Sequence, residues 1–71
     1  MQLTLYDIRK NKLGWTQKQF ASAIGISVKA YRDKEKGKYP FDQDEMFLIS
    51  KIVGEPMDKI FSPRSHQNGA N

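Results

Sequence analysis

The sequence predicts an all-α fold, built as a compact set of five short helices. Residues that cap or open helices precede helically spaced apolar residues at five places along the chain. A glycine follows four of these segments, as is common where a helix ends: Gly14, Gly25, Gly37 and Gly54. No two segments resemble paired strands. With 71 residues, of which 38% are hydrophobic, the chain has room for one small core and one domain.

The first helix is expected to begin at Thr4, whose hydroxyl can cap it, and to run to about Lys12. Its inner face would carry Leu5 and Ile8. Gly14 then ends it.

The second helix is predicted from Gln17 to Ile24. Thr16 followed by Gln19 three residues later forms a capping box, and Trp15 with Phe20 occupies the two positions of a hydrophobic staple. Trp15 is therefore expected in the core. The inward-facing residues of this helix are Phe20, Ala21 and Ile24.

Three further helices complete the predicted fold. Ser27 caps a helix over 28–36, with Ile26 and Tyr31 at its staple positions. Asp42, with Glu45 as its capping-box partner, starts another that Gly54 closes. Pro56 fits the first turn of a short last helix. On the helix before it, Met46, Ile49, Ser50 and Val53 share the inner face. The last helix carries Met57, Ile60 and Phe61. The domain is expected to span 3–61, and the polar tail 62–71 to be disordered.

Positive charge is concentrated in one part of the sequence. Residues 9–38 hold nine basic and two acidic side chains, a net charge of +7, whereas residues 39–61 carry −3. The first segment is thus suited to a polyanion and the second is not.

Composition also excludes several classes of protein. The chain has no Cys and one His, His66, so disulfide scaffolds, zinc fingers and thiol nucleophiles are ruled out. The longest apolar run, 46–49, is too short for a membrane span, and the start lacks a secretion signal, so we expect a soluble cytoplasmic protein. No spacing of glycines, carboxylates or a nucleophile supports catalysis, a cofactor or a small-molecule ligand.

The three residues Gly25 to Ser27 separate the second and third helices. So short a connection forces the two helices to cross steeply. One helix can then lie against a sugar-phosphate backbone while the next enters the major groove. The outer face of the third helix carries Val28, Lys29, Arg32 and Asp33, a set that can contact guanine and the thymine methyl group.

The combined pattern resembles the helix-turn-helix family of phage repressors and Cro proteins. It is most similar to short phage and prophage regulators of Gram-positive bacteria, within the XRE family. The residues that carry the resemblance are 16–21, 25–27, Tyr31, 34–35, 37–38, Phe41, 49–50, 53–54 and 60–61. It implies a lambda-repressor-like domain that binds double-stranded operator DNA, usually as a homodimer, in a bacterial cytoplasm at the nucleoid.

The resemblance also implies roles for individual residues. Gln17 and Lys18 would contact phosphate, the recognition helix 28–36 would read bases, and Lys36 and Lys38 would lie along the backbone. The base-reading set is Val28, Lys29, Arg32 and Asp33. Asp33 is expected to orient Arg32 or Lys29, and Glu35 to support structure. Lys34 stands where the wider family has an apolar residue.

A second surface suggests a different function. Leu48 lies opposite the inner face of its helix, Ile52 lies on the same side, and Phe61 follows in the last helix. These three residues are expected to form a protein-contact surface. The main hypothesis is a Cro- or repressor-type regulator. The alternative is an antirepressor that binds a partner phage repressor and has weak DNA affinity of its own, and an antitoxin is a minor third possibility.

Overall fold

The computed structural model describes residues 2–61 as an all-helical fold, which confirms the predicted class. Its elements are α1 (Leu3–Asp7), η1 (Ile8–Leu13), α2 (Gln17–Ile24), α3 (Val28–Lys36), α4 (Gln43–Val53) and α5 (Met57–Ile60). Since η1 is a π-helix that continues α1, the two form the first of five helices. The predicted tail 62–71, including His66, lies outside the described residues.

Local capping fixes the starts of α2, α3 and α4 where the sequence predicts them. The Thr16 hydroxyl accepts from the backbone N–H of Gln19 at 3.1 Å, while the Thr16 N–H donates to the Gln19 side chain at 2.8 Å. Asp42 and Glu45 form the same reciprocal pair at 2.8 and 3.0 Å. The Ser27 hydroxyl accepts from the third backbone N–H of α3. These bonds satisfy N–H groups that a helix start otherwise leaves unpaired.

Two predicted helix starts are wrong. Thr4 lies inside α1, which begins at Leu3 without a side-chain cap. A tertiary contact lies beside this start, where the N–H of Gln2 donates to the Glu35 carbonyl at 2.9 Å. Pro56 is the N-cap of α5 and not its first helical residue, since its ψ of 150° is extended. The first helix ends at Leu13, before Gly14, as expected.

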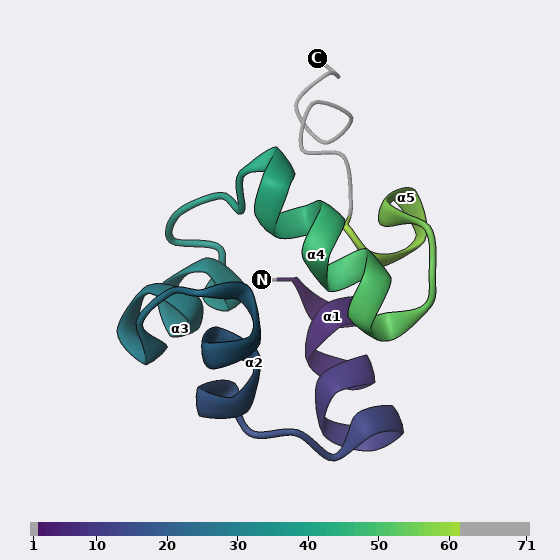
Figure 1. The fold of residues 1–71 in the computed structure, drawn as a ribbon, viewed down its shortest axis with the longest axis horizontal. Helices are drawn as coiled ribbons and strands as arrows, with labels where there is room; N and C mark the ends of the chain where they lie inside the picture. Colours follow the sequence, from purple (N-terminus) through teal and green to yellow (C-terminus); the bar gives the residue numbers. More distant parts are fainter. Residues whose placement is uncertain (1, 62–71) are drawn as a thin grey trace.

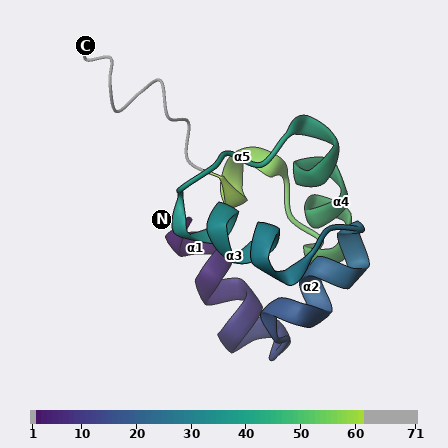
Figure 2. The ribbon, with the colours of Figure 1, turned by 90° about the vertical axis from the view of Figure 1, so that its left-hand side faces the viewer.

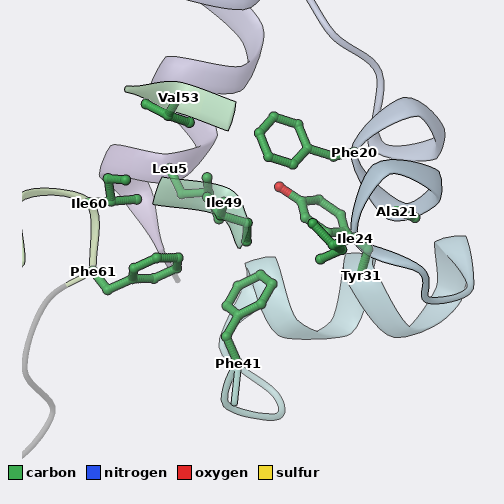
Figure 3. Packing of buried hydrophobic residues seen from close by; sticks show 10 residues of the cluster. All are labelled: Leu5, Phe20, Ala21, Ile24, Tyr31, Phe41, Ile49, Val53, Ile60 and Phe61. Carbon is green, nitrogen blue, oxygen red and sulfur yellow. The ribbon is translucent and has the colours of Figure 1, made fainter. Parts of the chain in front are cut away.

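The core is a chain of aromatic rings surrounded by aliphatic side chains (Figure 3). Trp15 meets Phe20 edge-on at 5.3 Å between centroids, as the staple predicts, and Phe20 stacks on Tyr31 at 5.6 Å. Phe41 continues the chain to Tyr31 at 5.7 Å and to Phe61 at 5.4 Å. This chain joins α2 and α3 to the segment after α5, so it connects the two sides of the fold.

These two sides can be followed in Figure 1, where α2 and α3 lie on one side and α1, α4 and α5 on the other. Figure 2 turns the side of α2 and α3 toward the viewer, with α3 in front. Within residues 2–61, no helix is long and apolar enough to cross a bilayer. The same residues contain no group of three or more acidic, His or Cys side chains placed to hold a metal ion.

The structure corrects the expected protein-contact surface. Phe61 is only 8% exposed and packs on Phe41, so it belongs to the core. Ile52 is half-buried against the core. Leu48 is 42% exposed, and Phe47 beside it, which the sequence prediction missed, is 51% exposed. The exposed apolar surface of α4 is therefore the pair Phe47 and Leu48.

Candidate nucleic-acid interface

The turn between α2 and α3 sets the geometry of this surface. Gly25 ends α2 in the left-handed conformation, with φ at 77°, which side chains rarely adopt. The N–H of Ile26 then returns to the carbonyl of Ala21 at 3.0 Å and closes the helix end. Because α3 begins after Ser27, the chain changes direction within three residues.

The outer face of α3 is polar and exposed. Val28, Arg32 and Lys36 follow one another at intervals of four residues, with Lys29 beside them, and all four are exposed. The opposite face carries Tyr31, which is fully buried in the core. The helix is thus held by one face and leaves the other exposed.

A buried ionic cluster lies under α3. The Arg9 guanidinium donates to both carboxylate oxygens of Glu35, at 2.8 and 3.1 Å, and to the Trp15 carbonyl at 2.8 Å. The Tyr31 hydroxyl and the Gln17 amide also donate to that carboxylate, each at 2.9 Å. Four hydrogen bonds from three side chains therefore satisfy Glu35, which is 2% exposed. Its expected structural role agrees with these contacts.

The cluster shifts the pKa values of its members. Burial alone would raise the pKa of Glu35, but hydrogen bonds from Arg9, Gln17 and Tyr31 outweigh it and hold that pKa below its ordinary value. The hydrogen bond to Glu35 raises the pKa of Arg9. Burial, and then the negative charge of Glu35, raises the pKa of Tyr31. The ionised pair and the neutral phenol are thus the stable forms.

Gln17 connects this buried cluster to the exposed face. Its amide nitrogen is held by Glu35, and its oxygen accepts from Nε of Arg32 at 3.4 Å. The Gln17 side chain therefore contacts both the buried Glu35 and the exposed Arg32. Sequence reasoning placed both residues at the interface but missed this connection, because the two lie 15 positions apart in the chain.

The sequence offers Arg32 or Lys29 as the partner of Asp33, and in the structure Asp33 pairs with Lys29. The distance from Lys29 Nζ to Asp33 Oδ2 is 3.0 Å, across one helical turn. This hydrogen bond, together with the charges of Lys38 and Lys36, lowers the pKa of Asp33. The carboxylate therefore stays ionised and holds the Lys29 ammonium at the outer face.

Lys34 stabilises the fold from the far side of α3. Its ammonium lies 2.7 Å from both carboxylate oxygens of Glu45, and both side chains are mostly buried. This ion pair joins α3 to the first turn of α4. The pair also explains how a Lys is accommodated at this mostly buried position, because Glu45 neutralises its charge.

The remaining predicted contact residues surround α3. Lys18 is exposed on α2, Lys36 lies in the last turn of α3, and Lys38 follows Gly37 in the loop. Lys38 Nζ lies 5.7 Å from the centre of the Tyr39 ring. Tyr39 is 53% exposed and was not predicted, although an aromatic residue beside a Lys in a basic loop is a signal that could have identified it.

The structure also refines the charge argument. Arg9, counted in the +7 segment, is 6% exposed and neutralised by Glu35, so it adds nothing to the basic surface. Lys34 is likewise paired and mostly buried. The exposed basic residues of this segment are Lys10, Lys12, Lys18, Lys29, Arg32, Lys36 and Lys38.

A steep turn between two helices, with a basic exposed face on the second, defines the helix-turn-helix class of DNA-binding domains. A family model described as helix-turn-helix matches residues 5–60. The chain belongs to this family, of the XRE type, and is a DNA-binding regulator whose partner is double-stranded DNA. No curated protein and no solved structure gives a significant match.

Proposed function

We propose that the chain is a sequence-specific transcriptional regulator of the phage Cro or repressor type. The observation that carries this proposal is the arrangement of Arg32. It is exposed in the middle of α3, and the Gln17 amide holds it from the buried side. A preoriented Arg on a helix that enters the major groove is suited to bidentate contact with guanine.

The other outer-face residues would complete base reading. Lys29, steadied by Asp33, can donate to guanine O6 or N7. Val28, 36% exposed at the start of α3, can meet a thymine methyl group. These two contacts, together with that of Arg32, would set the sequence preference.

Backbone contacts would come from residues around this face. The start of α2, at Gln17 and Lys18, presents unpaired N–H groups and the positive end of the helix dipole to phosphate. Lys36 and Lys38 extend the positive surface beyond α3. Such contacts fix the register of the protein on DNA without reading its sequence.

Two copies would occupy two half-sites roughly 34 Å apart, one turn of B-DNA. We place this activity at the nucleoid, in the cytoplasm of a bacterial host, within the regulation of a phage or prophage.

The test is a selection followed by a titration. A cognate duplex is first selected from a random library with the full chain. Cognate and scrambled duplexes are then titrated at several salt concentrations. We expect tighter binding to the cognate duplex, by ~10³-fold or more, and affinity that falls as salt rises. Equal affinity for both duplexes would contradict a sequence-specific regulator.

A second candidate is an antirepressor that binds a phage repressor and has weak DNA affinity of its own. The exposure of Phe47 and Leu48, in the acidic half of the chain, favours it. The test is co-purification with a repressor encoded beside this gene. Leu48→Lys should then abolish the complex and leave DNA binding intact. For a regulator that acts by itself, no such complex forms.

A further inference from the structure

One face of α4 contains a short strip of exposed side chains, Asp44, Phe47, Leu48 and Lys51, which we call the α4 strip. These four positions follow the spacing at which residues share one face of a helix. The face opposite packs into the core through Ile49. The α4 strip is therefore the part of α4 that is turned away from the rest of the described fold.

The apolar centre of the strip is exposed to water. Phe47 and Leu48 are neighbours, 51% and 42% exposed, and the nearest cover is Lys51, whose ammonium lies 5.3 Å from the Phe47 ring centre. A single exposed apolar residue needs no explanation. Two large ones side by side, with a charge of each sign at the ends, have the composition of a small interface.

The charges on the strip are complementary to those of a second copy of the strip that runs in the opposite direction. Asp44 comes three residues before Phe47, and Lys51 comes three residues after Leu48. When two such helices pack antiparallel about a two-fold axis through the centre of the strip, each Phe47 meets the partner's Leu48. Each Asp44 then lies opposite the partner's Lys51, twice over by symmetry.

We propose that two copies of this chain associate through the α4 strip, with their α4 helices antiparallel. This pairing deepens the proposed function, because it names the surface on which the regulator would dimerise, and it rests on that function for its use on DNA. A parallel pairing is disfavoured, since it sets Asp44 against Asp44. A strongly basic partner is also disfavoured, because the strip carries one charge of each sign.

The exposed area of four side chains is small beside that of a stable dimer interface. The association in free solution is therefore weak, and two half-sites on one duplex would strengthen it by bringing two copies together. Sedimentation equilibrium of the full chain, in low salt and without DNA, measures it directly.

Charge exchange tests the predicted register. In a dimer of the Asp44→Lys variant, Lys faces Lys at both contacts. In a dimer of the Lys51→Asp variant, Asp faces Asp at both contacts. Each variant should dimerise at least about tenfold more weakly than the unmodified chain. An equimolar mixture of the two should recover dimers, because both contacts in the mixed dimer are again Lys opposite Asp. Asp58→Lys, the same charge change at an exposed position on α5, is the matched control and should leave dimerisation unchanged.

Two outcomes would overturn the proposal. The first is that either single variant dimerises as strongly as the unmodified chain. The second is that the mixture fails to associate although helical content and melting temperature show that both variants are folded. Because no DNA is present, these results are independent of the proposed function. Failure of that function would be seen separately, as the absence of sequence preference in the duplex titration.

Discussion

Glu35 is the residue that joins the interior to the exposed face of α3 through its contacts. It holds Arg9 of η1, Tyr31 of its own helix and Gln17 of α2. Because the carboxylate is buried, its charge is tolerated only while these donors are in place.

Glu35→Gln should destabilise the protein by about 3–5 kcal/mol at neutral pH, since it leaves the Arg9 charge buried without a partner. Urea denaturation at low temperature measures the loss. Lys12→Ala is the control, because the Lys12–Glu55 pair is long, at 3.5 Å, and exposed. It should cost less than ~1 kcal/mol. Equal losses in the two variants would contradict the importance of the buried cluster.

The same cluster predicts a dependence on pH. The folded-state pKa of Glu35 lies below its ordinary value of 4.5. Its ionisation therefore stabilises the fold fully above that value, and the stabilisation is lost as pH falls through the folded-state pKa. In denaturation from pH 7 to pH 3, the gap in stability between the unmodified chain and Glu35→Gln should narrow below about pH 4.5. A constant gap would contradict this assignment.

Arg32→Ala should weaken binding to the cognate duplex by ~1–3 kcal/mol and relax the preference at one base pair. The guanidinium is exposed and already oriented, so its loss removes a base contact and leaves the fold intact. Titration against duplexes substituted at each position measures both effects. A uniform loss on every sequence would instead identify Arg32 as a phosphate contact.

The helices whose ends carry capping residues and glycines in the sequence were predicted correctly. The bounds of α2, α3 and α4 follow from caps and glycines within a few residues of each end, as with Thr16 and Gly25. The start of α1 could not be predicted from a cap, because no side chain caps this helix. The π-helical geometry of η1 has no sequence signature that we can identify.

For the candidate site, sequence identified the exposed face of α3 but not what lies beneath it. Arg9 was counted as surface charge because its partner is 26 positions away. Phe61 was expected at the surface because the core contact with Phe41 is tertiary. Residue type and spacing reveal which side chains can share a helix face, whereas partners from other helices appear only in the fold.

The contribution of the Ser27 cap to stability can be tested by one substitution and one matched control. Ser27→Ala removes the hydroxyl that accepts from the third N–H of the helix and should cost ~1 kcal/mol. Ser22→Ala, at an exposed position inside α2, removes no cap and should be neutral or slightly stabilising. Chemical denaturation of both variants checks this, and a similar loss in each would argue against a specific capping effect.

For the whole molecule, charge is distributed unevenly along the chain. Most exposed basic residues of the described fold belong to η1, α2, α3 and the following loop, and only Lys51 and Lys59 lie in α4 and α5. Most acidic residues lie in α4, α5 and their connections. In the proposed complex, the acidic residues of 42–58 would oppose docking through α4 and α5, because like charges repel.

Lys38→Ala should weaken binding to every duplex alike and lower the slope of log affinity against log salt by about one. The loop lysine is exposed, and its loss removes one neutralised phosphate. Lys59→Ala, an exposed lysine on α5, should leave the slope unchanged. A change in sequence preference with Lys38→Ala would show that this loop reads bases.

The bridge through Gln17 has a consequence for engineering new operator preferences. Exchanging the outer face of α3 for that of another regulator would replace Arg32 but retain the amide of α2 that holds it. Substitutions at contacting residues are seldom additive. Helix α3 is therefore not a self-contained module, and we expect a successful graft to carry position 17 together with position 32.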